Sequence, residues 1–303
     1  MITTNLTGNL GNHMWQLAVS KSIAKKLGYE WGINPIPSYD YFNGKSQMYF
    51  MDVDYGLSVK EIVNEYHEKS IKIFHKDEVD ITIIDKNIFN IKDNTIILGH
   101  KAAKGANLQD ENYFSAIEVE VKNWFKTKPE YSEQYENKLK KLGITLDENL
   151  CVINFRGGEY RNIPNVLLRK EYWRDSINYM LSNNKDMKFL LITDDVECAN
   201  QFMPFQIPAL HIDVGFDFYV VNQAKWLIIS NSTFGWWAAW LNSNVNKIVA
   251  PKYWARHNVS NGYWSVGHSY TKGFYYMDRE GNLNDYETCR EQAEQFYKEH
   301  NLI

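Results

Sequence analysis

Three short segments contain residue types that bind phosphate, and each directly follows a predicted strand. Residues 8–12 form a G-x-x-G loop, in which glycines let the backbone approach a ligand and the next helix presents free N–H groups to an anion. Residues 154–160 contain Arg156, whose guanidinium suits bidentate contact with a phosphate. Residues 230–233 place hydroxyl groups at the start of a predicted helix. Convergence of these segments on one crevice predicts a pyrophosphate ligand.

Each segment also has a purely structural interpretation. The glycines of residues 8–12 suit a tight turn that needs positive φ. Arg156 could pair with Glu159 at the strand end, and such surface pairs contribute little stability. Ser232 could serve as a helix N-cap, which is compatible with phosphate binding at the same place.

Several other chemistries lack their sequence motifs. No G-x-x-x-x-G-K-[ST] is present, and no G-x-G-x-x-G follows the first strand, which disfavours P-loop NTPases and dinucleotide oxidoreductases. The pair Asp52 and Asp54 resembles the D-x-D site of metal-dependent glycosyltransferases, but such spacing arises easily by chance, so no metal site is predicted. The three cysteines (Cys151, Cys198 and Cys289) form no C-x-x-C pair, which predicts neither zinc nor a disulfide framework and fits a reducing compartment.

Composition narrows the class of protein further. The chain has 303 residues, 44% of them hydrophobic, and a formal net charge of −4, so nonspecific nucleic-acid binding is not expected. No signal peptide and no apolar run of about 18 residues is evident. We therefore expect a cytoplasmic protein without a transmembrane segment, and peripheral membrane association stays open.

The elements that would position the three segments alternate along the chain. Strands are predicted at 2–6, 95–98, 150–155, 188–193, 209–212, 226–230 and 247–250. Helices are predicted at 13–27, 113–125, 130–142, 171–181, 196–202, 217–224, 233–241 and 285–300. Alternation of this kind implies right-handed βαβ units and an α/β fold with mostly parallel sheets, in which ligands bind beyond the carboxyl ends of the strands.

Read in order, the three segments resemble glycosyltransferase family 11, the α-1,2-fucosyltransferases. Gly8-Asn-Leu-Gly-Asn-His-Met-Trp15 is similar to the family's G-G-L-G-N-Q-M-F, and Asn154-Phe-Arg-Gly-Gly-Glu-Tyr160 is similar to H-I-R-R-G-D-Y. Ser230-Asn-Ser-Thr-Phe-Gly-Trp-Trp-Ala-Ala-Trp-Leu241 differs at one position from S-N-S-T-F-S-W-W-A-A-W-L. Weaker similarities include Thr193-Asp-Asp195 and Ala250-Pro-Lys-Tyr-Trp254.

The resemblance implies a GT-B-like α/β fold with two Rossmann-like domains facing an interdomain cleft. Residues 1–145 would form the acceptor-side domain and residues 146–303 the nucleotide-sugar domain, with the last helix able to pack back on the first domain. The implied reaction is inverting, metal-independent transfer of fucose from GDP-fucose to a hydroxyl of a glycan, with galactose O2 favoured. The GDP-sugar is a substrate, and no cofactor is implied.

The resemblance also implies roles for individual residues. Arg156 would neutralise the β-phosphate, Ser232 and Thr233 would hold the diphosphate from the other side, and Asp217 would contact the guanine. Asp217 has a structural alternative as a helix N-cap or first-turn carboxylate. The remaining implied donor-binding residues are Asn154 and Asn231. The loop facing donor sugar and acceptor comprises Gly8, Asn9, Gly11, Asn12 and His13, and the candidates for the general base are Glu159 and His13.

The chain departs from the family pattern where the donor would bind. Asn154 replaces the family's His, Gly157 its second Arg, Glu159 its Asp, and His13 its Gln. Loss of one guanidinium weakens diphosphate binding by about 1.5–3 kcal/mol. These departures leave two alternatives open, namely a glycosyltransferase using another nucleotide sugar such as GDP-rhamnose, and a glycan-binding protein whose catalytic site has decayed.

Overall fold

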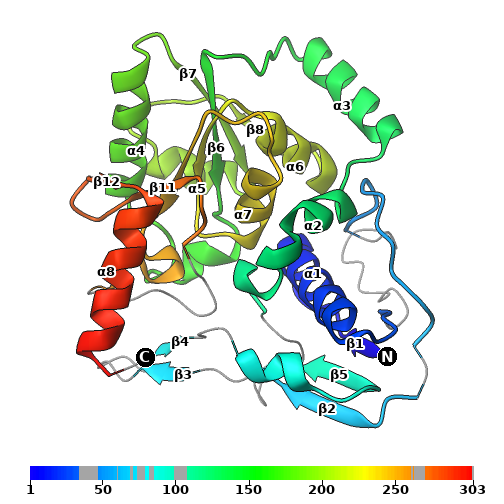
Figure 1. Cartoon of the computed structure of the whole chain (residues 1–303). Coiled ribbons are helices and arrows are strands. Elements are labelled where there is room, and N and C mark those ends of the chain that lie inside the picture. The colour runs from blue at the N-terminus through cyan, green and yellow to red at the C-terminus, as the bar shows by residue number, and fades with distance from the viewer. Residues whose placement is uncertain are drawn as a thin grey trace. The chain divides into compact units, whose positions relative to one another are not determined.

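The computed structural model describes residues 1–33, 47–59, 61–68, 71–73, 79–81, 85–98, 108–260, 262 and 270–301 (Figure 1). The chain divides into two compact units. The N-terminal unit comprises Met1–Lys128, and the C-terminal unit comprises Pro129–Ser265 and Tyr270–Ile303. Each unit contains a parallel sheet with helices packed on it, so the predicted α/β class is confirmed.

The C-terminal unit is built on a seven-stranded sheet. Its strands are β6 (Leu150–Phe155), β7 (Lys188–Thr193), β8 (Ala209–Leu210), β9 (Trp226–Ile229), β10 (Lys247–Pro251), β11 (Phe274–Met277) and β12 (Leu283–Asn284). The order is β12-β11-β10-β9-β6-β7-β8, and only β12 is antiparallel. Counted along the chain, the parallel strands follow the Rossmann order 3-2-1-4-5-6. The order reverses between β6 and β9, where such sheets bind ligands.

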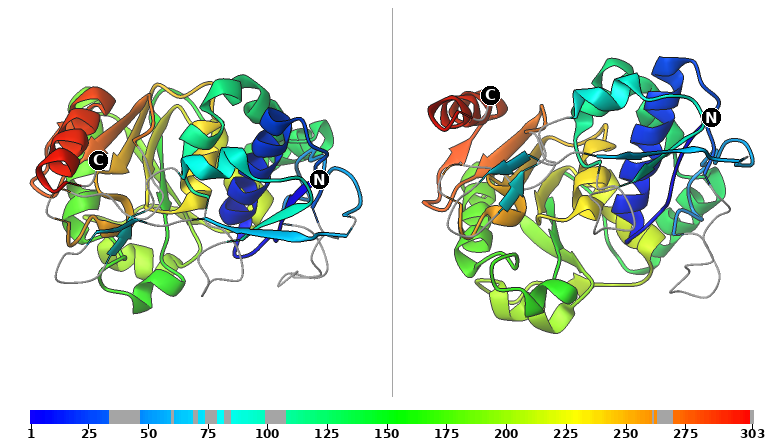
Figure 2. Two further views of the ribbon diagram at one scale, coloured as in Figure 1. Left: turned by 60° about the horizontal axis from the view of Figure 1, so that its bottom comes forward. Right: turned by 90° about the horizontal axis from the view of Figure 1, so that it is seen from below.

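Helices cover both faces of this sheet (Figure 2). They are α4 (Lys170–Asn183), α5 (Val196–Phe202), α6 (Val214–Gln223), α7 (Thr233–Trp240) and α8 (Tyr286–Glu299). Helix α3 (Pro129–Lys141) packs on α6, and the unit also has the short 3₁₀ turns η4 (Glu159–Asn162) and η5 (Trp254–Arg256). Cys151, Ile153 and Phe155 alternate along β6 and join one core cluster with α4 and α5. Burial on both faces explains the continuous apolar run of this strand.

The N-terminal unit has a smaller parallel sheet in the order β1-β5-β2. Its elements are β1 (Ile2–Thr4), α1 (Leu10–Leu27), β2 (Asn64–His67), β3 (Ile71–Ile73), β4 (Val79–Ile81), η1 (Lys86–Asn90), β5 (Thr95–Leu98), η2 (Glu111–Tyr113), η3 (Ser115–Ile117) and α2 (Glu118–Trp124). Helix α1 ends at Gly28, whose φ of 71° is left-handed and favours glycine.

One predicted boundary differs from the structure. Helix α3 groups with the C-terminal unit because the Tyr135 ring packs on Phe216 and Tyr219, with centroids 5.8 Å and 5.5 Å apart. The units therefore divide after Lys128 rather than after residue 145. Helix α8 groups with the C-terminal unit, in line with the predicted range 146–303, and contacts β11.

Two predicted helices also begin elsewhere. The single helix expected at 113–125 is wrong, because the backbone of Phe114 leaves the helical region at ψ 10° and buries its ring, which separates η2 from η3 and α2. Helix α6 begins at Val214 instead of residue 217, because the Asp213 carboxylate accepts the Phe216 N–H at 2.9 Å and caps the helix. Within the described part of the chain, no helix combines the length and the apolar character that crossing a membrane requires.

Candidate active site

The second and third segments that the sequence predicts to bind phosphate meet where the strand order reverses. Strands β6 and β9 are parallel neighbours, with Asn154 paired to Ile229, and the Ser230 N–H donates to the Asn154 carbonyl oxygen at 2.9 Å. Arg156 follows β6, and Ser232 and Thr233 follow β9 at the entrance of α7. Segments about 75 residues apart in sequence therefore share one edge of one sheet, as the parallel pattern predicts.

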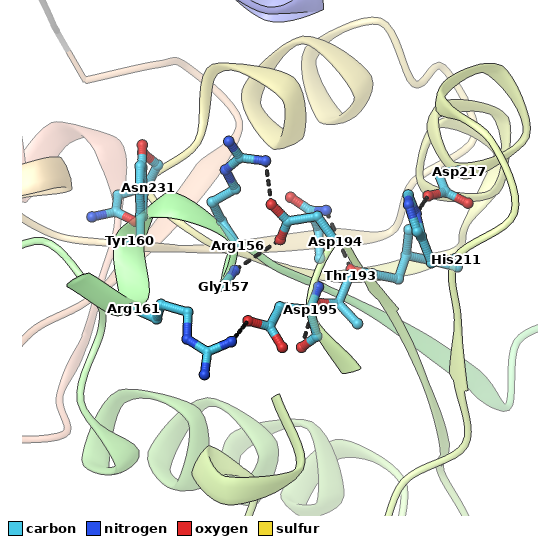
Figure 3. A network of polar contacts seen from close by, with 12 residues as sticks. Arg156, Gly157, Tyr160, Arg161, Thr193, Asp194, Asp195, His211, Asp217 and Asn231 are labelled. Carbon is cyan, nitrogen blue, oxygen red and sulfur yellow. Dashed lines mark hydrogen bonds and ion pairs between the residues drawn. The ribbon is translucent and has the colours of Figure 1, made fainter. Parts of the chain in front are cut away.

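Arg156 pairs with Asp194 rather than with Glu159 (Figure 3). Asp194 follows β7, the other neighbour of β6, and its second carboxylate oxygen accepts the Gly157 N–H at 2.9 Å. The Arg156 guanidinium carbon also lies 5.6 Å from the centre of the Tyr160 ring. Glu159 lies exposed on η4. The Arg156–Glu159 ion pair considered from the sequence is therefore replaced by the Arg156–Asp194 pair, which joins the loops after two adjacent strands.

The two glycines after Arg156 allow the β6 and β7 loops to approach closely. A Cβ atom at Gly157 would lie 2.7 Å from the Asp195 Cβ, and one at Gly158 would collide with an Asp194 carboxylate oxygen. A side chain at Gly158 would displace the Asp194 carboxylate from its place beside Arg156, and one at Gly157 would press on Asp195. The family's second Arg, at the position of Gly157, would need a different local backbone arrangement.

The entrance of α7 contains buried polar atoms that make no hydrogen bond within the described residues. They are Asn154 Oδ1, Ser230 Oγ and Asn231 Oδ1. The amide nitrogen of Asn231 donates to the Val166 carbonyl at 2.8 Å, which leaves its oxygen unused. Ser232 occupies the N-cap position of α7, but its hydroxyl makes no capping bond. Buried polar atoms of this kind are available to bind a water molecule or a ligand.

Two departures from the family pattern contact each other below this entrance. Gly235 stands where the family has Ser, and a Cβ there would collide with Oδ1 of Asn154, the residue that replaces the family's His. The carboxamide of Asn154 therefore fills space that a serine side chain would need. The two exchanges form one packing unit on the α7 side of the sheet.

We expect Gly235→Ser to lower the free energy of unfolding by about 1–3 kcal/mol, because the added side chain overpacks the site. Asn154→Ala in the same chain should recover much of that loss, since it removes the colliding carboxamide. Urea unfolding of the wild type, both single variants and the double variant measures the coupling, which should reach about 1 kcal/mol. Additive effects would contradict the packing unit.

Asp217 lies in the first turn of α6, and Asp213 supplies the N-cap. The buried carboxylate of Asp217 accepts the Ile212 N–H at 3.2 Å and pairs with Nδ1 of His211 at 2.7 Å. Burial raises the pKa of Asp217, and the bond from His211 opposes that rise. The first-turn placement agrees with the structural alternative, while contact with a guanine stays a prediction.

The first segment belongs to the N-terminal unit. Gly8 adopts φ 80°, which agrees with the tight-turn interpretation, and Asn9 occupies the N-cap position of α1 without a side-chain bond. Asn12 Oδ1 accepts the amide N–H of Gln109 at 3.1 Å. Burial lowers the pKa of His13 to about 4, and a hydrogen bond to the Gly8 backbone opposes the shift, so this imidazole is neutral at pH 7.

Sequence reasoning missed Asp194 as the partner of Arg156. The signal available in the sequence was the pair Asp194 and Asp195 directly after the strand at 188–193. Because β7 is a parallel neighbour of β6, the carboxyl ends of the two strands lie at the same edge of the sheet, beside the Arg156 loop. Asp195 instead caps α5 through the Cys198 N–H at 2.9 Å and pairs with Arg161 at 3.0 Å.

Two hollows elsewhere among the described residues are lined by neither Arg156 nor Ser232. One of about 380 Å³ lies between α5 and β8, and one of about 200 Å³ lies beside α8. Within the described ranges, no group of three or more His, Cys, Asp or Glu side chains has an arrangement suited to a metal ion. Asp54 instead accepts the Gly56 N–H at 2.8 Å and pairs with Lys21 at 3.0 Å.

Two known proteins are similar to this chain in sequence. An α-1,2-colitosyltransferase of Escherichia coli is 24% identical over 294 residues, covering 87% of this chain and 95% of that protein. The O-antigen biosynthesis glycosyltransferase WbnK of Escherichia coli is 27% identical over 127 residues, covering 38% of this chain and 42% of that protein.

Two solved structures are similar at low identity. The NodZ α-1,6-fucosyltransferase soaked with GDP-fucose has a TM-score of 0.46 and 12% identity, covering 82% of this chain and 94% of that chain. POFUT1 in complex with GDP has a TM-score of 0.47 and 10% identity, covering 82% and 97%. The family model described as glycosyl transferase family 11 matches residues 1–277. The chain therefore belongs to glycosyl transferase family 11.

Proposed function

We propose that this protein transfers fucose from GDP-fucose to a hydroxyl of a glycan, with inversion at the sugar and without a metal ion. One observation carries the proposal: Arg156 and the hydroxyl-lined entrance of α7 share the edge between β6 and β9. Membership in family 11 supports glycosyl transfer, and the name of the NodZ structure associates a fucosyltransferase with GDP-fucose. Galactose O2 is the acceptor position that we favour.

The donor's diphosphate would lie between Arg156 and the first turn of α7. When the bond between the anomeric carbon and the β-phosphate oxygen breaks, its electron pair stays on the phosphate. Fixed positive groups stabilise that charge more than they stabilise the intact donor, which accelerates the reaction. Arg156 supplies a full charge and the N-terminus of α7 supplies backbone N–H groups. Asp217 would accept hydrogen bonds from the guanine in the same C-terminal unit.

Inversion requires the acceptor hydroxyl to attack in line with the departing phosphate, usually with a base that takes its proton. Glu159 and His13 remain the two candidates. Glu159 is an exposed carboxylate near the turn that follows Arg156. His13 is neutral at pH 7 but weakly basic, because burial lowers its pKa to about 4. The GT-B-like pairing of the two units across a cleft, which would bring acceptor and donor together, is part of the same proposal.

A colitosyl donor is the second candidate. The relative that this chain matches over 95% of the relative's length is named an α-1,2-colitosyltransferase. Colitose is fucose without one ring hydroxyl, so the same diphosphate site would serve both donors. In this proposal Asn154, which replaces the family's His, would change the surroundings of the donor sugar, and this supports the alternative.

A nucleotide-sugar panel tests the proposal. We expect isothermal titration to show GDP binding at least tenfold tighter than UDP binding, since the guanine would contact Asp217. Turnover should be fastest with GDP-fucose and should survive EDTA. Faster turnover of GDP-colitose or GDP-rhamnose would change the assigned donor sugar but would leave the assigned reaction, glycosyl transfer, in place. Acceptor binding without any GDP-induced rise in melting temperature would instead support the decayed glycan-binding alternative.

A further inference from the structure

The carboxylate of Asp194 is bonded at both oxygens to consecutive residues of the β6 loop (Figure 3). One oxygen contacts the Arg156 guanidinium, and the other accepts the Gly157 N–H at 2.9 Å. Since Asp194 follows β7, the pairing of β6 with β7 determines where this carboxylate lies. The Arg156 and Asp194 side chains are 25% and 24% exposed, so the pair lies at the sheet edge within reach of a ligand.

The other side of Arg156 is also supported. The Tyr160 ring centre lies 5.6 Å from the guanidinium carbon, and the Tyr160 hydroxyl donates to the Asn231 carbonyl at 3.3 Å. Asn231 belongs to the segment after β9, where we place the diphosphate. The guanidinium is therefore located between the β7 loop and a ring attached to the proposed phosphate site.

We propose that Asp194 is a positioning residue that competes with the diphosphate for Arg156 and so keeps the released nucleoside diphosphate from being held too tightly. The inference rests on the proposed function. In the intact donor the β-phosphate carries one negative charge, and it gains a second as the sugar–phosphate bond breaks. The Asp194 carboxylate competes with the β-phosphate for Arg156 both before and after this bond breaks.

This competition limits how tightly the site holds its ligands. An interaction that is equally strong with the bound donor and with the transition state lowers KM without raising kcat. Competition from Asp194 weakens the contact of Arg156 with both states by a similar amount, so it leaves the chemical step nearly unchanged. Without Asp194, Arg156 would bind the donor and the released nucleoside diphosphate more tightly, and slower release of the product would lower kcat. Removal of the carboxylate should therefore tighten binding and slow turnover.

The test compares Asp194→Asn with Asp195→Asn. Asn at 194 keeps an oxygen for the Gly157 N–H but removes the charge, and Asn at 195 retains N-capping ability for α5. We expect Asp194→Asn to bind inorganic pyrophosphate and GDP about tenfold more tightly, and to reduce kcat with GDP-fucose about tenfold. Asp195→Asn should stay within about twofold of the wild type in both. Asp194→Ser, which also lacks the charge, replaces Asp194→Asn if that variant does not fold.

The outcomes separate this inference from the proposed function. Weaker or unchanged pyrophosphate binding by Asp194→Asn overturns the inference, because structural damage weakens binding and turnover together. Absence of pyrophosphate binding in every protein overturns it as well. If the wild type fails to bind GDP while Asp194→Asn binds pyrophosphate more tightly, the inference stands and the GDP assignment fails.

Discussion

Arg156→Ala should lower kcat/KM for the nucleotide-sugar donor by about 100- to 1,000-fold, the range for loss of one group aimed at developing charge. The melting temperature should change little. Arg156 and Asp194 are both partly exposed, so water can solvate the carboxylate that remains. Initial rates over a range of donor concentrations, together with thermal unfolding, measure both effects.

Two matched variants sharpen this prediction. Arg156→Lys keeps the charge but lacks the planar fork, so it should recover part of the activity. Arg161→Ala removes a neighbouring guanidinium that is 51% exposed and pairs with Asp195, and it should stay within a few-fold of the wild type. Arg156→Ala turning over the donor as fast as the wild type would refute the site assignment.

The second large effect that we expect is a loss of stability in acid: protonation of His257 should lower the free energy of unfolding of the C-terminal unit. His257 is 3% exposed, its Nδ1 has no partner among the described residues, and its ring lies edge-on to Tyr172 at 5.4 Å. Burial, helped by the charge of Arg279, lowers the pKa of His257 to about 3. The charged groups around it are Arg279, Asp278, Arg169 and Lys252.

The sign follows from proton uptake. Between pH 6.5 and about 3 the unfolded chain binds a proton at this histidine and the folded chain does not, so stability falls as pH falls through that window. At about 1.4 kcal/mol per pH unit, the loss is about 2 kcal/mol at pH 5. His257→Phe should remove this part of the pH dependence of the free energy of unfolding. Urea unfolding at pH 7.5, 6 and 5 measures the difference between the two proteins.

A difference between wild type and His257→Phe that does not change with pH would contradict this assignment. The comparison cancels other titrating groups, including Asp217, whose raised pKa acts in the opposite direction. His13 in the N-terminal unit should add acid sensitivity of the same sign between pH 6.5 and about 4, because its pKa is also lowered.

The strands that hold the site could be predicted from the amino-acid pattern alone. The strands predicted at 150–155 and 188–193 agree with β6 and β7, because continuous apolar runs bounded by polar residues specify strands buried on both faces. The placement of Arg156 and Ser232 at carboxyl ends of strands followed from the same pattern. Strands β11 and β12 were not predicted. Strand β11 has four residues and β12 has two, and runs this short give little periodicity.

Only the tertiary structure decided which side chains meet. Local spacing suggested Glu159 for Arg156, whereas the β6–β7 pairing brings in Asp194, 38 residues away. The contact between Asn154 and Gly235, and the packing of α3 on α6, have the same origin. Periodicity reports which face of an element is buried. Strand order sets which faces and ends become neighbours, and that order arises from long-range packing that no local pattern encodes.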